Sequence, residues 1–437
     1  QTCALPILAE AFWLMEGYFV RTLGMHRVYN SAFMHMMRDE ETDKYRQVMK
    51  NTLEFDPEIL KRFVNFMNNP DEDTAVTQFG KGDKYFGVCT VLATMPGLPM
   101  FGHGQFEGFS EKYGMEYRRA YEEENPDQGL IDHHLATITP LLRCREKFAD
   151  VTDFRLYDLV SPDGGVNEHV LAYSNGQATQ RSLIVFNNTS TATSGWINES
   201  SPMASKGEGN EHQLASHRLA EMFDLQRGPQ RYAIFSDSVS GQQFLRSNVE
   251  LHERGLFLEL DPYQSVVFLE MDEVVDDDTR QYGNLSSYLH HRGVPNVLLA
   301  MKEALLEPVH SSFERLVRSQ VPLNTESQPT GQPSDPTFMD RTARLLEDLL
   351  HEISKLGKFA SSTETASNTI LLRHQAVVKG IQNGSFVQMR NGTNDQLPGP
   401  YFEITLVNWS LVHGLGLVSD DKEDAEISRS WLDEWHF

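Results

Sequence analysis

Apolar and polar positions change their spacing along the chain, and these changes divide it into three stretches. From residue 8 to about residue 146, short apolar runs alternate with longer segments of mixed polarity, as in strands that alternate with helices. The pattern predicts strands at 8–13, 63–67 and 97–101, with helical segments between them. One of these helical segments is expected to begin with Asp56 as its N-cap and Pro57 in its first turn. Strands and helices in this order imply a parallel sheet of an α/β fold, in which polar loops follow the strand ends.

Residues 147–273 show a different pattern, in which short alternating strands are separated by turn-rich stretches. Short strands with frequent turn signals favour an antiparallel β-sandwich. The expected strands span 170–173, 182–186, 231–234, 256–260 and 265–271.

Residues 274–437 are predicted to form a mostly helical extension, which begins within an acidic boundary segment. A helix is expected at 294–306, and a linker rich in Ser, Thr, Gln and Pro lies near 323–337. Leucine and isoleucine residues between 345 and 356 recur at helical spacing, which indicates an amphipathic helix. One hypothesis is that these helices are an interaction module. The sequence leaves the oligomeric state open.

The composition is that of a globular protein, and its charge narrows the range of partners. The 437 residues include 38 Lys and Arg against 62 Asp and Glu, a net charge of −24, so nucleic acid and anionic membranes are disfavoured as partners. No apolar run is long enough to span a bilayer. Three cysteines are too few for a disulfide framework, so we expect a reducing, cytoplasmic setting.

The first seven residues look foreign to the rest of the chain. They resemble the in-frame translation of a sequencing-library adapter, and no initiator Met or basic leader precedes the first apolar run. We therefore expect residues 1–7 to be a non-native head, the natural sequence to resume at Leu8, and a natural upstream part to be missing.

Two acidic positions at expected strand ends are the main candidates for chemistry. Glu10 lies in an apolar run, which would raise the pKa of its carboxyl group and suit a general acid. Asp71 precedes two more acidic residues, Glu72 and Asp73, and the group would favour a metal or an oxocarbenium-like transition state. Two alternatives stay open: Glu10 paired with a buried Arg or Lys, and Asp71 as a helix cap or loop carboxylate.

The segments around these residues resemble glycoside hydrolase family 13, the α-amylase family. Residues 8–13 are similar to its fifth-strand motif, and residues 63–72 to the seventh-strand motif, usually written F-x-x-N-H-D. Residues 96–105 are similar to the eighth strand and its loop, and 147–273 to the family's domain C. The resemblance implies the second half of a (β/α)8 TIM barrel at 8–146, followed by the β-sandwich and the helical extension.

The resemblance also implies roles for individual residues. Glu10 would be the general acid/base, and Asp71 would hold the hydroxyl groups of a sugar in the transition state. The implied substrate is an α-glucan or maltooligosaccharide. No metal ligand and no cofactor are indicated; a structural calcium ion stays open but is not indicated either. The implied substrate-binding residues are Phe12, Trp13, Asn69, His103 and Gln105, of which His103 and Gln105 could equally be ordinary loop residues.

Two departures from the family pattern bear on activity. Pro70 occupies the position of the motif's histidine. The nucleophilic Asp of the fourth strand would precede Leu8, and retaining glycosidases need nucleophile and acid about 5–5.5 Å apart. We therefore expect this chain to be an inactive part of an α-glucan-active retaining hydrolase or transglycosylase. The alternative is a barrel-plus-sandwich scaffold that has lost catalysis and binds glucan or a protein partner.

Overall fold

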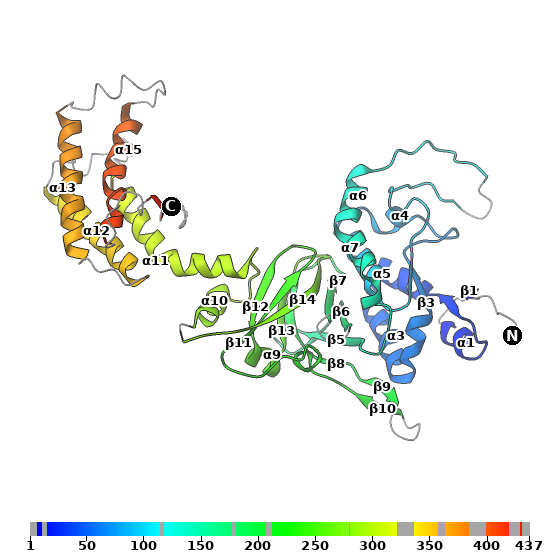
Figure 1. The fold of residues 1–437 in the computed structure, drawn as a ribbon. Coiled ribbons are helices and arrows are strands. Elements are labelled where there is room, and N and C mark those ends of the chain that lie inside the picture. Colours follow the sequence, from blue (N-terminus) through cyan, green and yellow to red (C-terminus); the bar gives the residue numbers. More distant parts are fainter. Residues whose placement is uncertain are drawn as a thin grey trace. The chain divides into compact units, whose positions relative to one another are not determined.

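The computed structural model describes residues 7–10, 15–113, 118–176, 181–206, 212–278, 280–320, 336–356, 363–383, 399–418 and 429–430. These residues form two compact units, 1–301 and 302–437. Phe12, Trp13 and nearly all of the expected linker near 323–337 lie outside the described residues. Figure 1 shows the elements of both units in chain order.

The first unit opens with a four-stranded parallel sheet in the order β1-β2-β3-β4. In its register, Val28 of β2 aligns with Ala9 of β1 and with Phe63 of β3, and Val64 aligns with Leu98 of β4. The expected strands at 63–67 and 97–101 are confirmed with slightly shorter bounds. The strands span Leu8–Ala9 (β1), Arg27–Tyr29 (β2), Phe63–Phe66 (β3) and Leu98–Met100 (β4).

Helices connect these strands, and local capping explains where some of them begin. The side chain of Asn30 accepts a hydrogen bond from the backbone N–H of Phe33 and caps α2. Asp56 caps the next turn as its sequence predicts, but the turn is a 3-10 helix, η1. The helical segments are α1 (Glu16–Arg21), α2 (Ser31–Arg38), α3 (Thr42–Phe55), η1 (Pro57–Arg62), α4 (Ala75–Phe79), α5 (Asp83–Thr94), α6 (Gln128–His133), η2 (His134–Ile138), α7 (Thr139–Arg143) and η3 (Arg145–Lys147).

An eight-stranded antiparallel sheet follows, in the order β12-β11-β14-β7-β6-β5-β8-β13. All five strands expected from the sequence are present. The sheet strands span Arg155–Val160 (β5), Val166–Asn175 (β6), Ser182–Asn187 (β7), Thr193–Ser200 (β8), Arg231–Asp237 (β11), Gln243–Ser247 (β12), Leu256–Leu260 (β13) and Ser265–Val275 (β14). The same region holds a hairpin of β9 (Met203–Lys206) and β10 (His212–Ala215), and the helices α8 (Leu219–Met222), α9 (Asn248–Glu253) and α10 (Gln281–Leu289).

The hydrogen bonding of this region differs from the expected sandwich of two sheets. Its eight strands form one continuous sheet, and side chains from both ends of that sheet, such as Phe235 of β11 and Leu258 of β13, share one core. Register shifts after Tyr157 in β5 and after Ser236 in β11 bend the strands. Bending lets one sheet enclose a core that the sequence pattern attributes to two.

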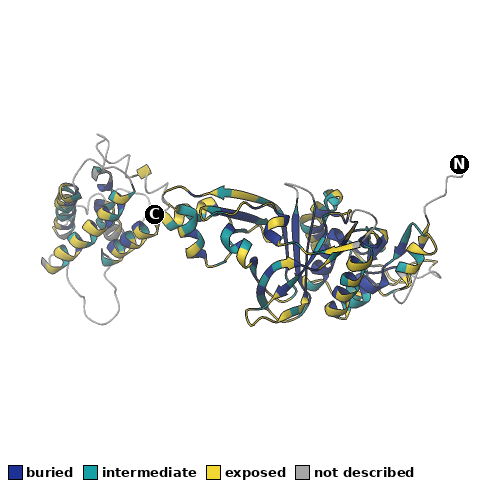
Figure 2. Cartoon of the chain, turned by 90° about the horizontal axis from the view of Figure 1, so that it is seen from below, coloured by how far each residue is buried: buried dark blue, intermediate teal, exposed yellow. Residues whose placement is uncertain are grey.

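The outer face of the antiparallel sheet packs on the helices of the parallel-sheet region (Figure 1). Leu171 of β6 and Phe186 of β7 belong to the same core as residues of α3 and α5, and Figure 2 shows buried positions along these strands. Gly87 of α5 makes room for the ring of Phe186, since an added Cβ would lie 2.0 Å from it. The two sheets therefore share a core within the first unit.

The second unit is built from helices. Leu346, Leu349 and Ile353 of α12 are buried in its core, which confirms the expected amphipathic helix. The helix expected at 294–306 is longer than its pattern suggested and continues through Pro308. No helix among the described residues is long and apolar enough to cross a membrane. The helices are α11 (Val297–Gln320), which starts in the first unit, α12 (Pro336–Lys355), α13 (Thr363–Gln382), α15 (Gly399–Val412) and η5 (Leu415–Val418).

Candidate functional site at the end of the parallel sheet

Glu10 follows β1 directly, but its surroundings differ from the sequence-based expectation. Its side chain is exposed to solvent, so the apolar residues next to it in the chain do not bury its carboxylate. No hydrogen bond or ion pair of this carboxylate occurs within the described residues. The ion pair between Glu10 and a buried Arg or Lys, which was the alternative, is therefore not found among the described residues either.

Asp71 is held by a turn that Asn69 organises. The buried side chain of Asn69 accepts hydrogen bonds from the backbone N–H groups of Asp71 and Glu72, both at 3.0 Å. The cap of the following helix α4 is Thr74, so Asp71 does not cap it. The side chain of Asp71 is exposed, and Lys112 donates a hydrogen bond of 2.7 Å to the backbone carbonyl oxygen of Asp71. The turn thus leaves the Asp71 carboxylate exposed to solvent, whereas the side-chain oxygen of Asn69 is occupied by hydrogen bonds within the turn.

The loop around Asp71 carries negative charge next to basic groups. His35 Nε2 lies 3.7 Å from the carboxylate of Glu72. The nearby Arg38 forms a two-pronged hydrogen bond with Asp39, which raises the pKa of Arg38, and Glu72 adds to this effect. No group of three His, Cys, Asp or Glu side chains arranged to hold a metal ion occurs in the described part of the chain.

The two candidates after β4 are placed differently from each other. His103 is exposed, and its ring meets that of Tyr113 edge-on at 4.5 Å. Gln105 is only 2% exposed: its Oε1 accepts a hydrogen bond from the N–H of Gly102 at 3.0 Å, and its Nε2 donates to the sulfur of Met67. The Gln105 side chain therefore shapes the loop that bears His103.

A buried polar network that the sequence did not reveal supports this loop. The hydroxyl of Tyr85 hydrogen-bonds with the carbonyl oxygen of Gln105 and with Nε2 of His134, both at 2.9 Å. Burial lowers the pKa of His134 to about 4, so its imidazole is neutral at pH 7. The sequence shows only two adjacent histidines there, with no sign that one of them is buried against a tyrosine 49 positions away.

A second buried network ties the ends of three strands together. The side-chain amide of Asn30, after β2, donates to Oδ1 of Asn65 in β3 at 2.8 Å. Asn65 in turn donates to the carbonyl oxygen of Pro96, just before β4, at 3.2 Å. Because each buried amide has a partner, these bonds fix the spacing of the strands whose loops carry the candidates.

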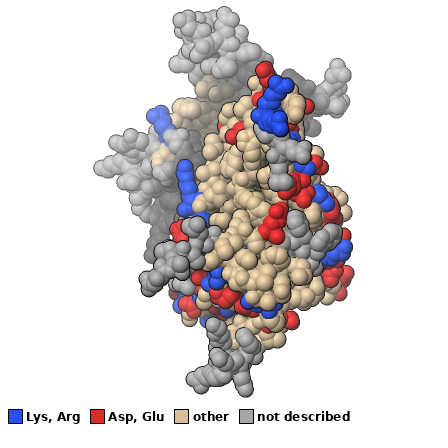
Figure 3. All heavy atoms as spheres, turned by 90° about the vertical axis from the view of Figure 1, so that its right-hand side faces the viewer, with Lys and Arg blue, Asp and Glu red and all other residues tan. Residues whose placement is uncertain are grey.

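Glu10, Asp71 and His103 thus follow three strands of one parallel sheet, on side chains that are exposed. Figure 3 shows this end of the chain, with acidic and basic side chains around an area that is mostly uncharged. The half-exposed residues Leu8 and Leu98 lie in the two outer strands of the sheet. The arrangement offers carboxylates to a ligand from solvent without enclosing it.

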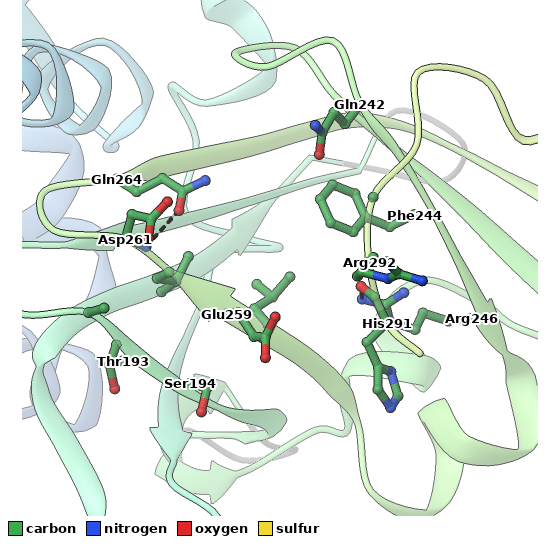
Figure 4. A pocket seen from close by; sticks show the side chains of 14 residues that line it. Thr193, Ser194, Gln242, Phe244, Arg246, Glu259, Asp261, Gln264, His291 and Arg292 are labelled. Atoms are coloured by element: carbon green, nitrogen blue, oxygen red, sulfur yellow. Dashed lines mark hydrogen bonds between the residues drawn. The ribbon is translucent and has the colours of Figure 1, made fainter. Parts of the chain in front are cut away.

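Two cavities lie elsewhere in the first unit. A cavity of about 700 Å³ borders β8, β12 and β13 of the antiparallel sheet (Figure 4), and one of about 390 Å³ lies beside α5. Neither is lined by Glu10, Asn69, Asp71 or His103. These two cavities and the candidate residues of the sequence motifs are therefore in different places.

Comparison with known proteins finds similarity only at the level of solved structures. No protein-family model and no curated protein matches the sequence. An α-amylase from Anoxybacillus is 15% identical with a TM-score of 0.40, over 62% of this chain and 52% of its own. An α-amylase from Geobacillus thermoleovorans in complex with acarbose is 15% identical with a TM-score of 0.42, over 61% and 53%. A debranching enzyme from Nostoc punctiforme is 14% identical with a TM-score of 0.41, over 60% and 51%. The chain spans about half the length of these structures.

Proposed function

We propose that this chain is the C-terminal half of the catalytic barrel, with the following β domain, of an α-glucan-active retaining glycoside hydrolase or transglycosylase of the α-amylase family. The order β1-β2-β3-β4 carries the proposal. All pairs in this sheet are parallel, so the loops after β1, β3 and β4, which bear the motif residues, leave the sheet at one edge. Barrel enzymes assemble their active sites at this edge.

The outer strands of the parallel sheet support a larger parent structure. Within the described residues, β1 and β4 each lack a partner strand on one side. Leu8 of β1 and Leu98 of β4 are both 47% exposed. Open edges that carry apolar side chains are unfavourable in water, and further strands of a barrel would pair with them and cover these leucines.

In the proposed mechanism three carboxyl groups act as nucleophile, general acid/base and stabiliser of the transition state. In the parent, an upstream Asp attacks the anomeric carbon while Glu10 protonates the departing glycosidic oxygen. Glu10 then deprotonates a water molecule or an acceptor sugar, which releases the glycosyl group. Asp71, whose carboxylate the Asn69 turn directs to solvent, hydrogen-bonds the sugar hydroxyls as positive charge develops on the ring. Water as acceptor gives hydrolysis, and a sugar gives transglycosylation.

The test uses the full-length parent protein and release of reducing sugar from maltoheptaose. Glu10→Gln keeps the size of the side chain and removes its proton transfer, so kcat is expected to fall by about 10²–10⁴-fold. Asp71→Asn is expected to lower kcat/KM by roughly 10²-fold or more, because a charge that stabilises the transition state is lost. Glu54→Gln, which neutralises an exposed carboxylate of α3 outside the candidate site, is the matched control and should leave both parameters within about two-fold.

Two results would contradict the proposal. Full activity of Glu10→Gln in the parent would remove Glu10 from the acid/base role. Turnover of maltoheptaose by the 437-residue chain alone would contradict the need for an upstream nucleophile, because the expected rate of that chain is indistinguishable from buffer.

A catalytically inactive scaffold that binds glucan is the second candidate, and Pro70 favours it. Proline at this position has no side-chain donor for a sugar hydroxyl and is itself exposed at the loop tip. The two candidates make opposite predictions for the parent. An upstream strand that ends in an Asp required for turnover supports the enzyme, and glucan binding without turnover supports the scaffold.

A further inference from the structure

The cavity of about 700 Å³ lies where the two end strands of the antiparallel sheet, β12 and β13, approach each other. Residues of β8 and the segment after α10 complete its walls (Figure 4). Each end strand has one edge without a partner strand among the described residues, apart from an isolated bridge between Gln243 and Val294. The volume is within the ~300–1,000 Å³ typical of small-molecule sites.

Arg246 is the unusual residue of this cavity. It is 2% exposed, and its guanidinium donates to the carbonyl oxygens of Leu245, Phe257 and His291. Its Nε has no hydrogen-bond partner, and no carboxylate pairs with the guanidinium within the described residues. Burial lowers the pKa of Arg246 to about 10, yet the group stays charged at pH 7. The charges of Glu250 and Glu259 offset part of this burial, and the guanidinium lies 5.5 Å from the ring of Phe244. The buried Nε is still without a hydrogen-bond partner, which is a reason to expect a polar ligand beside it.

The charges that line the cavity balance. Arg246 and Arg292 face Glu259 and Asp261, so a ligand with a net charge of either sign would meet two like charges. The remaining polar groups are the imidazole of His291 and several neutral amides and hydroxyls that can both donate and accept, and the ring of Phe244 supplies one apolar surface (Figure 4). These neutral groups are Thr193, Ser194, Gln242 and Gln264.

We propose that this cavity is a second binding site, distinct from the end of the parallel sheet, for a neutral polyhydroxylated ligand of the oligosaccharide class. Hydroxyl groups of such a ligand donate to Glu259 and accept from Arg292, so one uncharged molecule satisfies both kinds of charge. A sugar ring also has an apolar face that can pack on Phe244. The choice of an α-glucan as this ligand rests on the proposed function.

The rim of the cavity is preformed. His290 and His291 both have positive φ angles, 45° and 70°, a conformation that non-glycine residues rarely adopt in succession. The carbonyl of His291 is fixed by its 2.8 Å hydrogen bond from Arg246, and Val294 is paired with Gln243. A backbone segment held in this way has little freedom left to lose when a ligand binds.

The experiment measures binding of maltoheptaose to the intact 437-residue chain by isothermal titration calorimetry. We expect a Kd of ~1 mM or tighter. Glu259→Ala combined with Ser194→Ala removes two groups that face each other across β13 and β8, and it should weaken binding about ten-fold. The matched control is Glu168→Ala, because Glu168 is an exposed residue of β6 that does not line the cavity, and it should leave the Kd unchanged. Circular dichroism spectra that match the unmodified chain show that both variants are folded.

The remaining arms separate this inference from the proposed function. Loss of binding in Asp71→Asn, with the cavity variant unaffected, would overturn the inference and favour the parallel-sheet site. Binding of cellohexaose but not maltoheptaose, lost in the cavity variant, would support the cavity and contradict an α-glucan function. Inorganic phosphate or an extended peptide that binds here in place of both sugars would overturn the assignment to a neutral ligand, as would the absence of any binding.

Discussion

The two sheets of the first unit differ in what they carry: the candidate site residues follow strands of the parallel sheet, and the cavity of about 700 Å³ borders the antiparallel sheet. The parallel sheet has strands of two to four residues. Exposed carboxylates lie in the segments after two of these strands, Glu10 after β1 and Asp71 after β3. The antiparallel sheet has strands of five to eleven residues, two buried faces and a cavity of about 700 Å³ at its edge, and no sequence motif of a catalytic site was found in it.

This difference has a physical basis. The antiparallel sheet bends enough for its own two ends to share a core, so it is complete without other strands. The parallel sheet covers one face with its helices and leaves β1 and β4 open at the edges. A site at its strand ends is therefore shallow in this chain, and the proposed function requires additional strands to close around the substrate.

The largest expected effect comes from breaking the core that joins the two sheets. Phe186→Ala removes a fully buried ring that packs on Gly87, and it should reduce the free energy of unfolding by about 3–5 kcal/mol. Urea unfolding, followed by hydrogen exchange in peptides of α5 and β7, measures the effect. Phe55→Ala is the control, because Phe55 is 58% exposed. Faster exchange confined to β7, with α5 unchanged, would contradict a shared core.

The buried His134 makes the parallel-sheet region sensitive to acid. Its pKa is about 4 in the folded chain against 6.5 for an unburied imidazole, so the unfolded state binds more protons between these pH values. Stability is therefore full above pH 6.5 and falls as the pH drops toward 4, by up to about 3 kcal/mol. Urea midpoints between pH 4.5 and 7 test this.

The matched variants are His134→Gln and His133→Gln. The first should flatten the dependence of stability on pH. The second should preserve most of it, because burial is the main cause of the lowered pKa of His134 and the charge of His133 adds a smaller contribution. A slope that His134→Gln leaves unchanged would assign the acid sensitivity to other groups, among them His374 of the second unit, whose pKa burial also lowers.

A smaller effect on stability is expected from a change in α5 at its contact with Phe186 of β7. Gly87→Ala places a methyl group against the ring of Phe186 and should destabilise the chain by about 1–3 kcal/mol through overpacking. Gly129→Ala, within α6 where the nearest atom to an added Cβ is 3.5 Å away, should not destabilise the chain and should gain up to about 1 kcal/mol from helix propensity, so it serves as the control. Equal thermal midpoints for the two variants would show that the ring of Phe186 moves aside freely.

The sequence predicted the elements better than their assembly. The strand at 63–66 and the cap at Asp56 follow from short-range patterns, and both are present. The continuity of the antiparallel sheet was missed, since pairing between β5 and β8, or between β7 and β14, joins residues far apart in the chain. For Gln105 the sequence left a substrate contact and an ordinary loop residue open, and only the structure shows that its side chain hydrogen-bonds with Gly102 and Met67.

By itself, the sequence determined the α/β order of elements, the acidic residues after the parallel strands and the amphipathic character of α12, because these depend on neighbours within a few positions. Only the tertiary structure decided that Glu10 is exposed, that His134 is buried against Tyr85, and that the buried Arg246 lines a cavity. Burial and solvation depend on atoms from distant segments, and no local pattern encodes which segments will meet.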